Sequence, residues 1–140
     1  MSAADCPACL GRWPDPACRI ADLGPAVLYL HDDQFFPGWS VLVLKRHATE
    51  LYELIREERV ALMETVSRVA QALAATYGAR KTNYALLGNL ISHVHWHVLP
   101  RLADDPAPKD PVWSVRHAPR RLAPGELADR VAAIRGALSA

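Results

Sequence analysis

Three histidines alternate with apolar residues in the stretch SHVHWHVL, which occupies positions 92–99. Because alternate side chains of a β-strand point to the same face, His93, His95 and His97 are predicted to share one face, with about 6.5–7 Å between neighbours. A neutral imidazole is both a metal ligand and a nucleophile toward phosphorus. The spacing therefore fits a metal site or nucleophilic catalysis better than an ordinary exposed strand face, where Thr, Lys or Glu is usual.

A CxxC pair, CPAC, places Cys6 and Cys9 near the N-terminus. In a cytosolic protein such a pair is either redox-active or metal-binding, and no thioredoxin-like strand–helix–strand pattern surrounds it. Reduced thiols in a frayed terminus are the remaining alternative. Cys18 stands alone, and we expect no disulfide framework from three cysteines in a reducing compartment.

Apolar patterning predicts the elements that position these residues. Leu62, Val66, Val69 and Leu73 follow the helical period within a predicted helix over 56–77. The other predicted elements are strands over 26–30, 39–47, 83–87 and 92–99 and a helix over 124–138. We expect residues 1–25 to be irregular and Pro100 and the loop 104–111 to end the last strand region. The order of elements predicts an α+β fold, in which the long helix and the C-terminal helix pack on an antiparallel sheet within one domain over 1–140.

Composition narrows the classes of partner. Hydrophobic residues make up 51% of the chain and charged residues 22%, and the formal net charge is +1. This charge gives no reason to expect a nucleic acid as partner. No stretch approaches the ~20 apolar residues that cross a bilayer, and the N-terminus does not look like a signal peptide. We therefore expect a cytoplasmic protein without a membrane partner.

The stretch His93-Val94-His95-Trp96-His97-Val98-Leu99 resembles the signature of the histidine triad (HIT) proteins, in which three histidines alternate with apolar residues. The CxxC start, the hairpin ending in LVLKRH, the long helix and LGNLISHVHWHVLPR follow in that family's order, so the resemblance covers most of the chain. The last segment is similar to bacterial HIT proteins described as diadenosine polyphosphate hydrolases. The resemblance implies a HIT fold, a homodimer and an AMP-containing purine nucleotide as substrate.

The resemblance also implies roles for individual residues. His95 would attack the α-phosphate and form a nucleotidyl-imidazole that water hydrolyses. His97 would contact the phosphate, and the backbone carbonyl near His93 would hold the tautomer of His95. Asn89, Asn83 and Asp33 stand where family members contact the phosphates or the ribose hydroxyls; turn roles for Asn89 and Asp33 remain open.

A structural zinc site is implied in the same way. In some HIT proteins the CxxC pair, the histidine ending the second strand and the first triad histidine bind zinc, and here these are Cys6, Cys9, His47 and His93. Two positions depart from the family pattern: Trp39 replaces a histidine of the catalytic set, and Leu90 replaces a phosphate-contacting serine. The alternatives are therefore nucleotidyl transfer to phosphate, nucleotide binding with little turnover, and a catalytic zinc on all three triad histidines.

Overall fold

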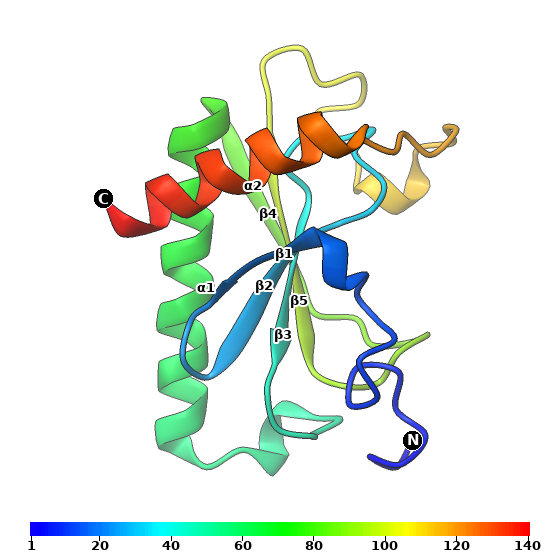
Figure 1. The fold of residues 1–140 in the computed structure, drawn as a ribbon, viewed down its shortest axis with the longest axis vertical. Helices are drawn as coiled ribbons and strands as arrows, with labels where there is room; N and C mark the ends of the chain where they lie inside the picture. Colours follow the sequence, from blue (N-terminus) through cyan, green and yellow to red (C-terminus); the bar gives the residue numbers. More distant parts are fainter.

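The computed structural model describes residues 1–140 and contains a five-stranded antiparallel sheet in the order β1-β2-β3-β5-β4 (Figure 1). The predicted α+β class is confirmed. The strands are β1 (Arg19–Asp22), β2 (Ala26–Leu30), β3 (Ser40–Leu44), β4 (Lys81–Ala85) and β5 (His95–Arg101). The helices are α1 (Arg56–Tyr77) and α2 (Pro124–Ser139), with short 3-10 turns η1 (Pro16–Cys18), η2 (Leu51–Glu53) and η3 (Val112–Ser114).

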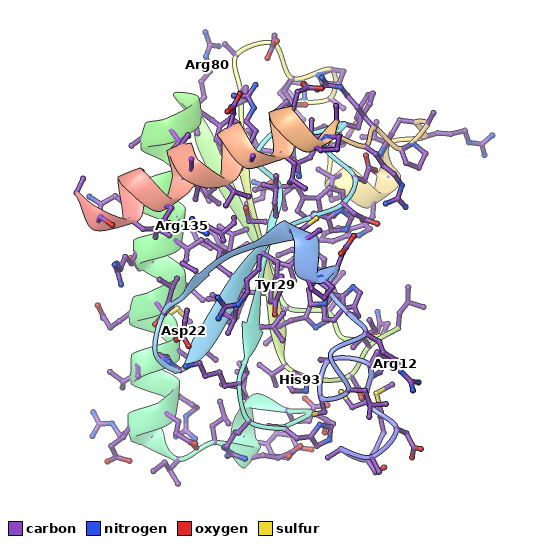
Figure 2. The ribbon with its side chains drawn as sticks, viewed as in Figure 1. Arg12, Asp22, Tyr29, Arg80, His93 and Arg135 are labelled. Atoms are coloured by element: carbon purple, nitrogen blue, oxygen red, sulfur yellow. The ribbon has the colours of Figure 1, made fainter.

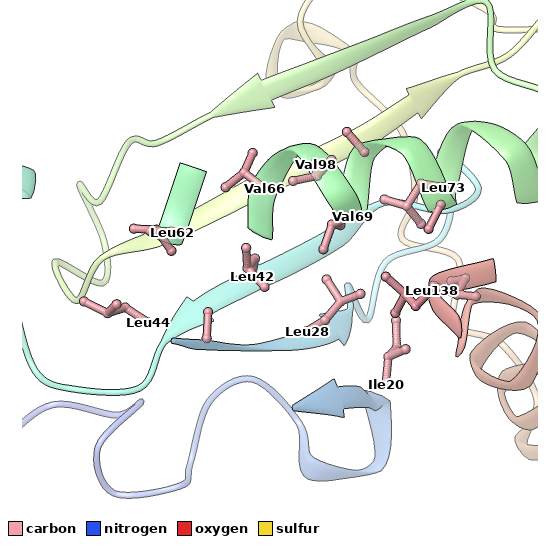
Figure 3. Packing of buried hydrophobic residues seen from close by; sticks show 14 of the residues in the cluster. Ile20, Leu28, Leu42, Leu44, Leu62, Val66, Val69, Leu73, Val98 and Leu138 are labelled. Atoms are coloured by element: carbon pink, nitrogen blue, oxygen red, sulfur yellow. The ribbon is translucent and has the colours of Figure 1, made fainter. Parts of the chain in front are cut away.

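One face of the sheet forms the main core with the two helices. The helix α1 packs on β5 and β4, and α2 crosses over α1 and contacts β1 (Figure 1). Side chains of α1 interlock with those of the central strands, as Figure 3 shows for Val66 and Val69 against Leu42. This packing fixes the position of β5, whose opposite face carries His95 and His97. None of the helices combines the length and apolar character that crossing a bilayer requires.

The helix α1 occupies the range that its apolar period predicts. At its start the Glu58 carboxylate accepts a hydrogen bond from the Ile55 amide at 3.0 Å, which satisfies one of the free N–H groups of the first turn. At its end Gly78 adopts the left-handed conformation with φ of 64°, as expected for a glycine that ends a helix.

Several expectations about strands were wrong. The strand β3 ends at Leu44 and not at residue 47, β4 covers Lys81–Ala85 and not 83–87, and β5 begins at His95, so that His93 precedes it. Residues 1–25 are not irregular throughout, because Arg19–Asp22 forms β1 and pairs with β2; only Ile20 of this strand is buried, so its sequence shows no alternation. Pro100 does not end the histidine strand either, because β5 continues to Arg101. The Arg101 carbonyl faces β4, because it accepts a hydrogen bond from the Arg80 amide. The nitrogen of the preceding Pro100 therefore faces the other way, toward the side of β3. The pairing with β3 ends at Val98, so no strand there requires an N–H donor from Pro100.

Candidate active site and metal centre

The histidine-bearing face of β5 opens onto a cavity of about 340 Å³. Its alternation is as predicted: Val94 and Val98 enter the core on the other face, and Trp96 packs against it. The residues that line the cavity come from the N-terminal segment, the β2–β3 loop, the 87–91 loop, β5 and η3; they are Trp13, His31, Leu87, Gly88, Asn89, Leu90, Ile91, His95, His97 and Trp113.

The hydrogen bond of His95 defines its tautomer. Its Nδ1 lies 2.7 Å from the backbone carbonyl oxygen of His93, and a carbonyl only accepts, so Nδ1 carries the proton. Burial lowers the pKa of His95, although this hydrogen bond opposes the shift. His95 is therefore neutral near pH 7, and the lone pair of its Nε2 is free. The edge of Trp13 packs against the ring, with centroids 4.8 Å apart.

His97 has the opposite tautomer. The Nε1–H of Trp39 donates to its Nδ1 at 3.0 Å, so the proton of neutral His97 is on Nε2. Burial, followed by the nearby His95 and His31, lowers the pKa of His97 to about 3. His97 is thus a neutral hydrogen-bond donor across the whole physiological pH range.

His31 is a cavity residue that the sequence patterns did not reveal. Its Nδ1 lies 3.0 Å from the Asp33 amide nitrogen, a donor, and also 3.3 Å from the Asp33 carbonyl oxygen and 3.4 Å from the Asp32 carboxylate, which are acceptors. The shorter amide contact favours the neutral form that carries its proton on Nε2. Burial lowers the pKa of His31, partly offset by the carboxylate of Asp32. The only sequence signal was a histidine directly after a predicted strand, in a segment that read as a turn.

The loop between β2 and β3 holds His31 and Trp39 in contact. The buried Gln34 amide donates to the carbonyl oxygens of His31 at 2.8 Å and Trp39 at 2.9 Å, which clamps the two ends of the loop. Gly38 has φ of 86°, and a Cβ there would lie 2.6 Å from Pro100. The two rings consequently stack with centroids 3.9 Å apart and planes 9° from parallel.

The residues predicted to bind substrate lie in different places. Asn89 lines the cavity with His95, and so does the exposed Leu90. Asn83 does not line it: its Oδ1 accepts from the buried Arg101 guanidinium at 2.7 Å. Asp33 is also outside the cavity lining, because its carboxylate is engaged in the connection between two loops.

The Asp33 carboxylate joins the β2–β3 loop to the segment before α2. Its Oδ1 accepts from the amides of Phe35 at 3.0 Å and Arg120 at 2.9 Å, and its Oδ2 accepts from His117 Nε2 at 2.7 Å. The other ring nitrogen of His117 donates to the Val115 carbonyl at 2.8 Å, so both nitrogens hold protons. The hydrogen bond to Asp33 accordingly raises the pKa of His117. Burial raises the pKa of Asp33, but the Arg120 amide, the His117 ring and the Phe35 amide together lower it below its ordinary value.

Replacing Asp33 with asparagine is expected to lower the free energy of unfolding by about 1–3 kcal/mol, because an amide cannot accept from all three donors. The stabilisation that His117 provides is complete below about pH 6.5 and is lost as the pH rises through its raised pKa. The stabilisation that Asp33 provides is complete above about pH 4 and is lost as the pH falls through its lowered pKa. Urea unfolding should therefore show a larger difference from the native chain at about pH 5.5 than at about pH 8.5. The exposed Asp32→Asn is the control, and an equal difference at both pH values would contradict the ion pair.

Four metal-ligating side chains meet where the N-terminal segment covers the start of β5, beside the labelled His93 (Figure 2). The ligand atoms of Cys6, Cys9, His47 and His93 all lie within 4.8 Å of one another. The Cys6 sulfur is 3.4 Å from His93 Nδ1, and the Cys9 sulfur is 3.3 Å from His47 Nδ1. This set of two thiols and two imidazoles fits the closed tetrahedral coordination of zinc.

The far nitrogens of both imidazoles have carbonyl partners. His93 Nε2 lies 2.6 Å from the Leu44 oxygen, and His47 Nε2 lies 3.1 Å from the Met1 oxygen. A carbonyl at Nε2 holds the proton there and leaves Nδ1 unprotonated, as metal-ligating histidines require. The four residues could thus hold one metal ion. Cys18 is buried elsewhere and, like the other two cysteines, is in no disulfide.

Comparison with known proteins gives three relevant relatives. A histidine triad protein from Bradyrhizobium japonicum superposes with a TM-score of 0.79 and 32% identity, covering 86% of this chain and 89% of that one. A zinc-bound histidine triad family protein from Mycobacterium smegmatis shares the fold, with a TM-score of 0.72 and 23% identity over 99% of this chain and 96% of that one. An adenosine 5'-monophosphoramidase of Schizosaccharomyces pombe is 23% identical over 87 residues, which are 61% of this chain.

The match to the yeast protein spans 65% of that relative's length. The family model of the HIT domain matches residues 16–104, which include β1 to β5 and all three alternating histidines. The family match and the similarity to the Bradyrhizobium structure, together with the alternating histidines, show that the chain belongs to the HIT family.

Proposed function

We propose that this protein hydrolyses a phosphoanhydride or phosphoramidate bond of an AMP-containing nucleotide, a diadenosine polyphosphate above all, through a covalent intermediate on His95. The observation that carries the proposal is the 2.7 Å contact between His95 Nδ1 and the His93 carbonyl, which leaves Nε2 as a neutral nucleophile. Membership of the HIT family supports nucleotide chemistry. The phosphoramidase from fission yeast supports an AMP moiety on the substrate.

The proposed reaction has two steps at phosphorus. In the first, His95 Nε2 forms a bond to the α-phosphorus while the bond to the leaving group breaks with its electron pair on that group, and the proton stays on His95 Nδ1, which donates it in a hydrogen bond to the His93 carbonyl. In the second, water attacks the phosphorus and releases a proton to solvent, the N–P bond returns its electron pair to Nε2, and AMP leaves. The Nε2–H groups of His97 and His31 and the amide of Asn89 would stabilise charge on the phosphoryl oxygens.

Trapping the intermediate tests the proposal. Protein mixed with excess diadenosine tetraphosphate is quenched in alkaline denaturant within milliseconds and digested, and the peptide with His95 is examined by mass spectrometry. We expect an added AMP mass on this peptide and free AMP at later times. Formation of ADP in place of AMP, in a reaction that requires inorganic phosphate, would instead identify a transferase. Binding of AMP without any release from a nucleotide would refute the hydrolase.

We also propose that Cys6, Cys9, His47 and His93 bind a structural zinc ion. The donor set and the carbonyl partners of both imidazoles support it, and a HIT relative from Mycobacterium smegmatis is zinc-bound. When bound, the ion would connect the N-terminal segment to His93, two residues before His95. It takes no part in the proposed reaction.

A homodimer through the β4 edge of the sheet is the proposed assembly. The strand β4 has no neighbour on its outer side, and Tyr84 on β4 and Met63 on α1 are about half exposed beside a hollow that includes Trp96. An open apolar edge is usually covered in a native protein. We expect the native chain to sediment as a dimer and Tyr84→Glu to sediment as a monomer. The control is Tyr52→Glu, which replaces another exposed tyrosine remote from this edge and should sediment as a dimer. Sedimentation of the native chain as a monomer at micromolar concentration would refute the dimer.

A further inference from the structure

The three imidazoles of the cavity are held by different partners at the same ring atom. His95 Nδ1 meets an acceptor, the His93 carbonyl at 2.7 Å. His97 Nδ1 meets a donor, the Trp39 indole N–H at 3.0 Å. His31 Nδ1 meets the Asp33 amide N–H at 3.0 Å and, farther away, two acceptors, which are the Asp33 carbonyl oxygen at 3.3 Å and the Asp32 carboxylate at 3.4 Å. His95 therefore presents a lone pair at Nε2 and His97 presents an N–H group there, and the shorter amide contact favours an N–H at Nε2 of His31 as well.

His97 is a poor acid, because a proton placed on its Nδ1 would face the indole hydrogen of Trp39 and break that hydrogen bond. A proton on His31 Nδ1 would find acceptors in the Asp33 carbonyl and the Asp32 carboxylate, so this ring is kept neutral by its burial. Burial lowers the pKa of both rings. The remaining cavity residues contain no carboxyl, amine or guanidinium group; they are Trp13, Leu87, Gly88, Asn89, Leu90, Ile91 and Trp113. No group of the cavity lining is thus suited to donate a proton to a leaving group near pH 7. The Nδ1–H of His95 is not available either, because it is hydrogen-bonded to the His93 carbonyl.

We infer that Trp39 keeps His97, the ring beside the nucleophile, as a neutral donor, so that this site cleaves phosphoanhydrides, whose leaving group departs as an anion, in preference to phosphoramidates. This inference rests on the proposed hydrolase. In phosphoanhydride cleavage the P–O bond breaks with its electron pair on the leaving phosphate, and no proton is required. In phosphoramidate cleavage the nitrogen must gain a proton before it leaves as an amine, and the cavity has no acid to supply it. Trp39 acts here as a positioning residue, through His97.

The selectivity can be measured with substrates that share the AMP moiety and differ in the leaving group. They are diadenosine tetraphosphate, the p-nitrophenyl ester of AMP and adenosine phosphoramidate. Because general acid catalysis typically contributes about 10²–10⁴-fold, we expect kcat/KM for the phosphoramidate to be at least about 100-fold below that of the other two. The loss should appear mainly in kcat, since all three present the same AMP to the cavity.

Substitutions of Trp39 test how the preference arises. Trp39→His offers His97 a ring that also accepts, and Trp39→Phe removes the N–H donor while keeping an aromatic ring beside His31. Both are expected to raise the ratio of phosphoramidate to ester cleavage, about 10-fold or more for Trp39→His, with faster phosphoramidate cleavage as the pH falls. Trp96→Phe is the matched control: it removes an indole N–H from the neighbouring strand position, where that group is buried without a partner, and it should leave the ratio unchanged.

A measurement without substrate checks the tautomers directly. In ¹⁵N-labelled protein near pH 7, His97 should show an unprotonated Nδ1 and a protonated Nε2, His31 should be neutral, and Trp39→His should change the His97 signals. An imidazolium or an Nδ1–H on His97 in the native chain would overturn the inference. So would native cleavage of the phosphoramidate as fast as the ester, although the hydrolase would stand. Release of AMP from none of the three substrates would overturn both.

Discussion

Replacing His95 with alanine is expected to lower kcat for AMP release by about 10⁴-fold or more, with zinc content and melting temperature close to native values. Loss of the nucleophile of a covalent mechanism has effects of this scale. His95 is the ring whose unprotonated nitrogen is left free by the His93 carbonyl, and no other cavity residue presents such a lone pair. Stopped-time assays of AMP release, with metal analysis on the same samples, provide the measurement.

Two further variants separate a nucleophile from a structural or metal-binding role. His97→Ala keeps the nucleophile and removes one donor to the phosphoryl oxygens, so its loss should be smaller, about 10²–10³-fold. His95→Gly leaves space beside the 340 Å³ cavity, and added imidazole should restore part of the turnover by replacing the missing ring. Full activity of His95→Ala would refute the mechanism, and activity that follows added zinc would identify a catalytic metal.

Removal of the metal is expected to have the largest effect on stability. We predict about one zinc ion per native chain, and a ligand present at 1,000 times its dissociation constant stabilises the folded state by about 4 kcal/mol. For a chain of this size, chelation should lower the melting temperature by roughly 10 °C. Without chelator, Cys6→Ser should melt at the same lowered temperature as the chelated native chain, because the buried Cys6 sulfur lies in the ligand cluster. Adding the chelator to this variant should cause no further change.

The matched control is Cys18→Ser, which removes another buried thiol away from the cluster and should keep both the zinc and its stabilising effect. Because His93 contributes its ring to the cluster and its carbonyl to His95, chelation should also slow AMP release. Native protein that contains no zinc after purification and refolding in excess zinc would contradict the site. Zinc binding without any change in melting temperature would contradict its structural role.

The sequence by itself determined the class of fold and the family. The period of Leu62, Val66, Val69 and Leu73 predicted α1 at its observed bounds, because a helix that packs on a sheet must repeat its apolar face every three to four residues. The alternation of the histidines correctly placed His95 and His97 on one face of β5, but His93 precedes the strand and its ring lies in the cluster with the cysteines. Strand ends were less accurate, since they depend on where neighbouring strands stop; β5 runs through Pro100 for this reason.

Only the tertiary structure decided which side chains share the cavity and in which protonation state. His31 and Trp39 reach His97 because β3 lies between β2 and β5, a pairing that no local pattern encodes. Asp33 and Asn83 are engaged by His117 and Arg101, partners 84 and 18 residues away in the chain. The tautomers of His95 and His97 each depend on one hydrogen bond, to a carbonyl and from an indole, and His31 Nδ1 lies between the Asp33 amide and two acceptors. Residue types and spacing predict a nucleophile, but long-range contacts decide whether the rings beside it act as donors or as acids.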